Sequence, residues 1–219
     1  NPKEIRQQYA LAEPPAHGLV RQQPWVLQHR QEEADGITLR FGLSDQADRQ
    51  SLPPVEPTLT VRLDDGLSLA LNNHNHGNTP VWISQALHSY FAVSDSRQIT
   101  VHGLDTCPYV DALDDWQSHR QHGPLTVVGE TDRLYLQLPD TLHIDDPGWQ
   151  RRLTLSASGS RSAVVWNPWV DKSRRLTQFA GDAWQRMLCI ETARVLDNAL
   201  LLGPGEQHSM VVRFVTTAL

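Results

Sequence analysis

Cysteine is scarce in this sequence, and the shortage limits what can stabilise the fold. Two cysteines, Cys107 and Cys189, occur in 219 residues, far apart and outside any metal-type spacing. A disulfide framework is therefore not expected, and a reducing, cytoplasmic setting is favoured. Because neither cysteine nor histidine is clustered along the chain, we also expect no metal site and no cofactor.

Long apolar runs and an excess of positive charge are also missing. No run approaches the roughly 20 apolar residues that span a bilayer, and residues 1–6 contain no apolar signal region. The formal net charge of -6 argues against general binding to nucleic acid or to an anionic membrane. A local basic pocket for a small anion is compatible with it. The sequence begins without methionine, so we expect a fragment or a processed product.

Helical periodicity is scarce, whereas alternation with period two is frequent. Alternating segments cover residues 37–41, 59–63, 67–71, 134–138, 153–156 and 211–215. Such alternation predicts half-buried antiparallel strands, and Asp65-Gly66 between two of them predicts a hairpin. Residues 181–187 are compatible with one or two helical turns. The pattern predicts an all-β fold, a large antiparallel β-sandwich, with residues 1–219 in a single domain.

Glu191 stands in an otherwise apolar run, residues 188–193, that is typical of a buried strand. Burial of an unpaired carboxylate costs several kcal/mol, so such a residue is normally paired, hydrogen-bonded or adapted to a task. Glu191 is therefore the first candidate for a catalytic base.

Two histidines are weaker candidates when each is taken by itself. His88 lies among Leu87, Tyr90 and Phe91, and a histidine in such surroundings is more often a satisfied core residue than a catalyst. His17 stands in a glycine-bearing turn four residues before Arg21, a combination that is also common on surfaces.

Asp132 and the pair Trp166-Asn167 have structural explanations of similar weight. An aspartate at the start of a strand usually satisfies its own backbone. Tryptophans beside an Asn-Pro turn either plug a core or form the wall of a pocket for the apolar face of a sugar ring. For these residues alone, the structural interpretation is somewhat favoured over the functional one.

Taken in order, five segments resemble the hexose-6-phosphate 1-epimerases, a branch of the galactose mutarotase-like (aldose 1-epimerase) superfamily. They are residues 15–21, 86–91, 131–135, 165–169 and 189–193, and the last two (Val-Trp-Asn-Pro-Trp and Cys-Ile-Glu-Thr-Ala) are the most specific. The resemblance implies the galactose mutarotase-like supersandwich fold. It also implies an isomerase that interconverts the α and β anomers of a D-hexose 6-phosphate by acid/base ring opening and closure.

The resemblance further implies a role for each candidate residue. Glu191 would be the general base and His88 the general acid. The expected substrate-binding residues are Asp132 for sugar hydroxyls, Arg21 for the phosphate, His17 near the ring, and Trp166 with Asn167 in the pocket lining. Arg133 and Lys172 are further candidates for positive charge, each equally compatible with a solvated surface position. The expected partner is a small sugar phosphate, and a monomer is expected.

Two features depart from the family pattern. The strand-rich N-terminal region that precedes the His-Gly segment in family members is absent, so we expect the C-terminal three quarters of a longer family protein. Ala16 replaces a glutamine that often faces the substrate, a change worth about 1 kcal/mol in binding. The alternative function is a catalytically silent carbohydrate-binding or regulatory module. A third hypothesis is an interaction domain in which His88 and Glu191 are structural.

Overall fold

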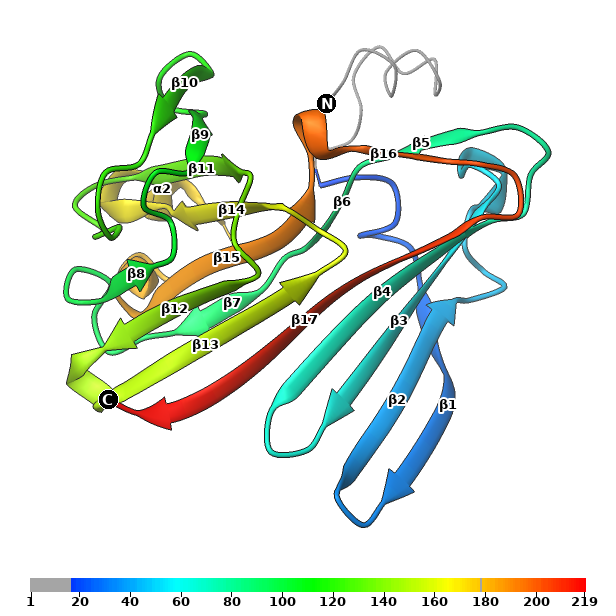
Figure 1. The fold of residues 1–219 in the computed structure, drawn as a ribbon, viewed down its shortest axis with the longest axis horizontal. Helices are drawn as coiled ribbons and strands as arrows, with labels where there is room; N and C mark the ends of the chain where they lie inside the picture. The colour runs from blue at the N-terminus through cyan, green and yellow to red at the C-terminus, as the bar shows by residue number, and fades with distance from the viewer. Residues whose placement is uncertain (1–16, 178) are drawn as a thin grey trace. The chain divides into compact units, whose positions relative to one another are not determined.

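A computed structural model describes residues 17–177 and 179–219 (Figure 1). Two compact units are distinguished within it. The first contains residues 17–85, Ser158–Ser160 and Arg194–Arg213, and the second contains Ala86–Ala157, Arg161–Ala193 and Phe214–Leu219. Ala16, which departs from the family pattern, lies outside the described residues.

The first unit consists mainly of a strongly paired antiparallel sheet. Its strands, in spatial order, are β1 (Trp25–Glu33), β2 (Gly36–Leu43), β3 (Val55–Leu63), β4 (Leu67–Asn75) and the first part of β17 (Gln207–Ala218). Strands β3 and β4 pair without interruption as far as Leu63 opposite Leu67, so the hairpin predicted at Asp65-Gly66 is confirmed. A second, two-stranded sheet joins β5 (Val81–Ile83) and β16 (Leu200–Leu202), and single 3-10 turns occur at Arg49–Ser51 and Leu196–Asn198.

The second unit contains the strands of two sheets. One set comprises β8 (Thr100–His102), β12 (Thr141–Asp146) and β13 (Arg151–Ser158), which are neighbours in that order. The other comprises, in order, β10 (Gln117–Arg120), β9 (Pro108–Asp111), β11 (Thr131–Leu136), β14 (Ser162–Asn167) and β15 (Met187–Arg194). Two short strands, β6 (Gln85–Leu87) and β7 (Tyr90–Ala92), lie beside β15.

One apolar core fills the second unit because both sets of strands turn their alternate residues toward it. Ile144 and Leu155 come from β12 and β13, while Tyr135, Val165 and Ile190 come from β11, β14 and β15. None of the five is more than 3% exposed. Every residue of β15 from Met187 to Ala193 is buried, as the apolar run around Glu191 predicts. The predicted all-β, antiparallel fold is confirmed, whereas the single domain stays a prediction.

The helices differ in part from the prediction. The segment 181–187 forms one 3-10 turn, Ala183–Arg186, and another such turn occurs at Pro147–Trp149. Helix α2 (Trp169–Arg175) was not predicted. Its seven residues are too few for a helical period to stand out from the sequence. No helix in the described ranges has the length and apolar character to cross a membrane.

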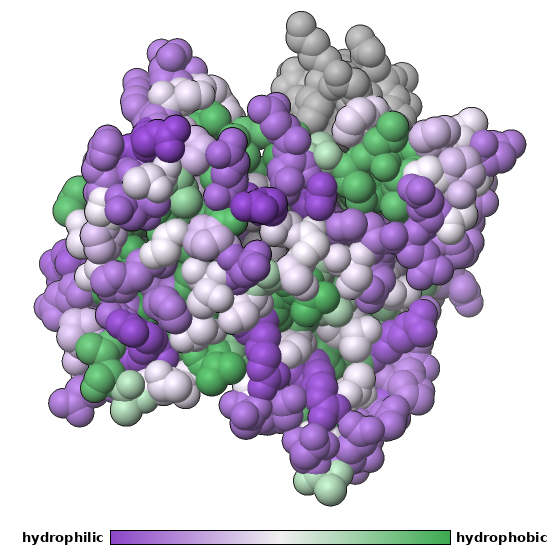
Figure 2. Space-filling view, viewed as in Figure 1, coloured by the Kyte–Doolittle hydropathy of each residue, from purple (hydrophilic) through white to green (hydrophobic). Residues whose placement is uncertain are grey.

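The surface visible in Figure 2 is largely hydrophilic, with apolar side chains scattered in small groups. Both cysteines are buried, and neither forms a disulfide within the described part of the chain.

Candidate active site

Glu191 lies on the face of the β11–β14–β15 sheet that is opposite the apolar core. Residues directly opposite each other on antiparallel strands share a face. The register therefore places Asp132, Trp166 and Cys189 in one row across the three strands. In the next row of the same face, Glu191 lies opposite Val164. This face of the sheet thus collects the polar residues of segments far apart in the sequence.

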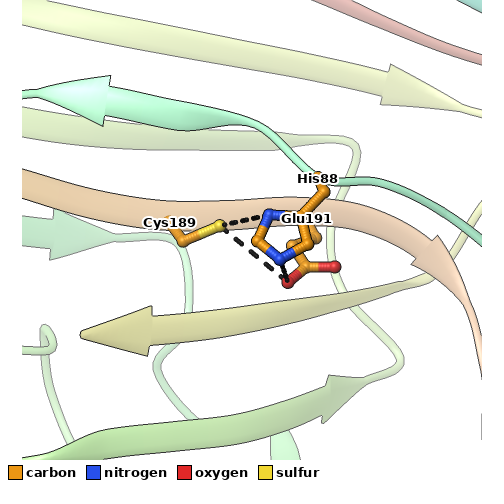
Figure 3. Close-up of side chains that lie close together, drawn as sticks. All are labelled: His88, Cys189 and Glu191. Atoms are coloured by element: carbon orange, nitrogen blue, oxygen red, sulfur yellow. Dashed lines mark hydrogen bonds and ion pairs between the residues drawn. The ribbon is translucent and has the colours of Figure 1, made fainter. Parts of the chain in front are cut away.

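His88 reaches the same face from the connection between β6 and β7 (Figure 3). Its Nε2 atom lies 3.2 Å from Glu191 Oε1, and its Nδ1 atom lies 3.3 Å from Cys189 Sγ. One ring nitrogen thus contacts the sulfur and the other contacts the carboxylate, and the sulfur and Glu191 Oε1 lie 3.9 Å from each other. Cys189 is fully buried, whereas the side chains of Glu191 and His88 are 12% and 24% exposed. The pair is largely shielded from water but accessible at His88.

One backbone carbonyl ties His88 to strand β15. The carbonyl oxygen of Ser89 accepts the thiol of Cys189 at 3.0 Å and the backbone N–H of Ile190 at 3.2 Å. Because Ser89 directly follows His88, these bonds hold the backbone of His88 against the strand that carries Glu191. The distance between the His88 imidazole and the Glu191 carboxylate is therefore set by backbone pairing and not by the conformation of a flexible side chain.

Aromatic side chains border the His88–Glu191 pair. Tyr90 stacks on the His88 ring with centroids 4.9 Å apart and planes inclined by 13°. Trp166 meets Tyr90 edge to face at 6.2 Å, and Phe179 meets Trp166 in the same way at 6.3 Å. Tyr90 is 52% exposed. Large, rigid aromatic faces of this kind suit a ring-shaped ligand with one apolar side.

Asp132 and Lys172 form the charged part of this face. Lys172 Nζ, supplied by helix α2, lies 3.6 Å from Asp132 Oδ2, 3.0 Å from Glu130 Oε1 and 6.0 Å from the centre of the Trp166 ring. Burial raises the pKa of the Asp132 carboxyl, and the carboxylates of Glu130 and Asp111 add to this, while Lys172 opposes it. The site therefore holds a cation beside a carboxylate that is poorly solvated.

Arg133, the other candidate for positive charge, lies on the opposite side of β11. Its Nε is 3.3 Å from Asp111 Oδ2, and its guanidinium lies 4.7 Å from the centre of the Tyr109 ring. Its neighbour in sequence, Asp132, faces the row with Trp166. Of the two candidates, Lys172 is the one that the structure brings to Asp132.

Asn167 supports the site from within. Its fully buried amide nitrogen donates to the carbonyls of Trp184 and Met187 at 2.8 and 2.9 Å. Its Oδ1 accepts the backbone N–H of Trp169 at 2.9 Å. Trp169 has a φ of 55°, which is uncommon for a bulky residue, and the bonds of Asn167 hold that turn in place. Since α2 begins there, Asn167 also orients Lys172; its predicted place in the pocket lining stays a prediction.

His17 and Arg21 belong to the first compact unit and precede β1. Both are exposed. The carbonyl of Val20 accepts the backbone N–H of Gln23 at 3.2 Å and the indole N–H of Trp25 at 3.1 Å, which fixes the turn that carries Arg21. Their roles near the sugar ring and the phosphate stay predictions.

Sequence reasoning assigned no role to Cys189 or Tyr90. Each lies two residues from a candidate residue, Cys189 from Glu191 and Tyr90 from His88. On extended backbone that spacing puts two side chains on one side, so the signal was present. The contact between His88 with Tyr90 and Cys189 with Glu191 depends on strand register, which cannot be predicted from the spacing within either segment.

The fold defines a class of protein. The crystal structure of YeaD from Salmonella typhimurium, described as a putative mutarotase, matches this chain with a TM-score of 0.86 and 24% sequence identity. The match covers 96% of this chain and 70% of that one. The chain therefore has the antiparallel β fold of the galactose mutarotase-like class.

Residues 5–215 match the family described as aldose 1-epimerase, and the chain belongs to that family. It is 30% identical over 180 residues to a protein of Escherichia coli K12 named "Putative glucose-6-phosphate 1-epimerase", and 33% identical over 145 residues to one of the same name from Cenchrus ciliaris. These matches cover 82% and 66% of this chain, but 60% and 44% of the relatives. The chain thus spans less than two thirds of their length.

Proposed function

We propose that this chain is a mutarotase-type isomerase that interconverts the α and β anomers of a D-hexose 6-phosphate. The observation that carries the proposal is the 3.2 Å contact between His88 Nε2 and Glu191 Oε1, on a face bordered by aromatic rings. Membership in the aldose 1-epimerase family supports the reaction type, and the name given to the relatives supports the substrate class.

The reaction requires one acid and one base at the same time. The base removes the proton of the C1 hydroxyl while the acid protonates the ring oxygen, and the C1–O5 bond breaks to give the open-chain aldehyde. After rotation about the C1–C2 bond, the C5 hydroxyl attacks the other face of the aldehyde. The two proton transfers then run in reverse, so the enzyme ends each cycle unchanged.

Proton counting around His88 supports this division of roles. Either the Cys189 thiol donates to the Ser89 carbonyl and its sulfur accepts the N–H of His88 Nδ1, or the thiol donates to Nδ1 and the neutral ring carries its proton on Nε2. A neutral ring protonated at Nδ1 would present a lone pair from Nε2 to the Glu191 carboxylate at 3.2 Å, and the two acceptors would repel. The contact therefore calls for one proton between Nε2 and Oε1. A pair that carries one proton contains one acid and one base.

In the proposed reaction the ionised Glu191 takes the C1 proton, and protonated His88 gives its proton to the ring oxygen. The carboxylate of Asp132 would accept hydrogen bonds from sugar hydroxyls, and Trp166 and Tyr90 would cover the apolar face of the ring. The side chain of Arg21 would bind the phosphate, because a guanidinium fork matches a dianionic phosphate. The proposed roles of His17 near the sugar ring and of Asn167 in the pocket lining rest on membership in the family.

The test is NMR magnetisation transfer between the C1 proton of the α anomer and the C1 proton of the β anomer of glucose 6-phosphate. It is measured with the parent protein and with the variants Glu191→Gln and His88→Asn. General acid or base catalysis contributes about 10²–10⁴-fold, so each variant should lose at least about a hundredfold of the added rate. The same substitutions at exposed positions, Glu32→Gln and His122→Asn, serve as matched controls and should leave the rate unchanged.

Two outcomes would contradict the proposal. If the parent adds nothing to the spontaneous exchange but still binds the sugar phosphate, the chain is a silent carbohydrate-binding module. If unphosphorylated glucose exchanges as fast as its 6-phosphate, the phosphate role given to Arg21 is wrong.

A further inference from the structure

Three donor atoms of different elements converge beside β15 (Figure 3). A ring nitrogen of His88, Sγ of Cys189 and a carboxylate oxygen of Glu191 all lie within 4.8 Å of one another. The separations are 3.3 Å for Sγ and Nδ1, 3.2 Å for Nε2 and Oε1, and 3.9 Å for Sγ and Oε1. This cluster could not be predicted from the sequence, because 101 positions separate His88 from Cys189.

The separations of 3.3 and 3.2 Å are close to the edge of a metal coordination tetrahedron, but they involve different nitrogens of the His88 ring, and the sulfur-to-oxygen separation of 3.9 Å is longer. Zinc bonds of about 2.3 Å to sulfur and about 2.0–2.2 Å to nitrogen and oxygen hold the ligand atoms about 3.4–3.6 Å apart. A cation takes only one ring nitrogen, so the His88 ring must turn when it binds. The His88 side chain is 24% exposed, so it is the least buried of the three ligands.

The donor types select the kind of cation. Thiolate and imidazole favour zinc and similar ions, whereas magnesium and calcium prefer oxygen ligands throughout. Binding would release two protons to solvent, one from the Cys189 thiol and one from between His88 and Glu191. A dication replaces both, so the charge of the cluster is conserved.

We propose that His88, Cys189 and Glu191 form a binding site for a thiophilic divalent cation such as Zn²⁺, and that its binding blocks the epimerase reaction. Three protein ligands leave a fourth position open for water, as in zinc sites that exchange ligands. The cation occupies both groups of the acid/base pair, so neither can transfer a proton to a sugar. The blocking effect rests on the proposed function, whereas the binding itself does not.

The binding is tested with Co²⁺, whose absorption reports its ligands. The parent should take up one equivalent and develop a thiolate-to-cobalt charge-transfer band together with the visible bands of tetrahedral cobalt, and Zn²⁺ should displace it. Cys189→Ser should lose the charge-transfer band and bind Zn²⁺ at least tenfold more weakly. Cys107→Ser is the matched control, because Cys107 is also buried but its thiol faces the Gly103 carbonyl at 3.8 Å. It should retain the band.

The site is overturned if the parent shows no band, or if Cys189→Ser keeps it. Circular dichroism establishes whether each variant is folded. Should Cys189→Ser fail to fold, His88→Asn and Glu191→Gln decide the matter, since both keep the sulfur and should still weaken Zn²⁺ binding at least tenfold. Equal affinity in all of them rejects the site.

Inhibition is tested by anomer exchange in the presence of Zn²⁺. The parent and Cys107→Ser should both lose activity, with half-inhibition near the dissociation constant found by cobalt displacement. Stoichiometric binding without inhibition would overturn the blocking effect and leave the proposed function intact. If the parent catalyses no exchange at all, the proposed function fails, and the cobalt spectrum still decides whether the site exists.

Discussion

The two faces of the β11–β14–β15 sheet, built from the same three strands, have opposite characters. On the core face, Tyr135, Val165 and Ile190 are at most 1% exposed and belong to one apolar cluster. On the other face, Asp132 and Glu191 lie beside aromatic rings, and burial raises the pKa of the Asp132 carboxyl. Because side chains alternate along a strand, one face of the sheet can stabilise the unit while the other carries the candidate site residues. We therefore expect substitutions on the site face to lower stability less than substitutions on the core face.

Adjacent valines on β14 test this contrast with the same substitution. Val165 is fully buried in the core, whereas Val164 is partly exposed on the site face. We expect Val165→Ala to lower the free energy of unfolding by about 2–3 kcal/mol through lost burial and a residual cavity, and Val164→Ala by less than about 1 kcal/mol. Urea denaturation of both variants measures the difference. Equal losses would show that the two faces of the sheet contribute equally to stability.

Tyr135 tests the core face through pH. Its hydroxyl donates to Gln121 Oε1 at 2.7 Å, and burial raises its pKa to about 12, while the neighbouring Arg133 opposes the shift. Since the unfolded pKa is about 10, the folded state keeps its proton longer, and about 2 kcal/mol of stability present below pH 10 is lost by about pH 12. Tyr135→Phe should cost about 1 kcal/mol at neutral pH and lack this alkaline decline.

The test is to measure the free energy of unfolding of the parent and of Tyr135→Phe in buffers between pH 9 and 12. Burial also raises the pKa of Cys107, but that thiol is present in both and contributes the same background. Parallel curves for parent and variant would rule out Tyr135 as the source of the decline.

Asp132→Asn should give the smallest change in stability and a separate effect on binding. Burial raises the pKa of this carboxyl, so its ionised form lowers stability at neutral pH. The variant should be more stable by less than about 1 kcal/mol at pH 7, and the gain should vanish as the pH falls through the range in which carboxyls are protonated. The KM for the sugar phosphate should rise roughly tenfold, because a charged hydrogen-bond acceptor is lost.

Thermal unfolding at pH 7 and pH 3, together with anomer-exchange kinetics, measures both effects. Asp171→Asn is the matched control, since Asp171 is exposed on the same helix as Lys172. An unchanged KM in Asp132→Asn would remove this residue from the proposed pocket.

Much of the second unit was predictable because its cause is local. The alternation in residues 134–138 and 153–156 predicted strands, and the apolar run at 188–193 predicted the burial of Glu191. These patterns arise from the two-residue period of a strand, which a single segment reveals.

The remaining parts of the site depend on long-range pairing. The register that aligns Asp132 with Trp166, and Trp166 with Cys189, is a property of three strands together. The contact of Cys189 with His88 follows from it and is not encoded in either segment alone. Helix α2, which places Lys172 beside Asp132, begins at a left-handed Trp169 that no propensity indicates.

The carbonyl of Ser89, which receives both the Cys189 thiol and the Ile190 N–H, has a consequence for refolding. The segments it joins are about a hundred residues apart, and closing so long a loop is entropically costly until many other contacts repay it. Hairpins formed early by neighbouring strands therefore contain no assembled acid/base pair. Regain of the proposed activity would be a late event that reports the docking of residues 88–89 onto β15, after most of the β-structure signal has already recovered.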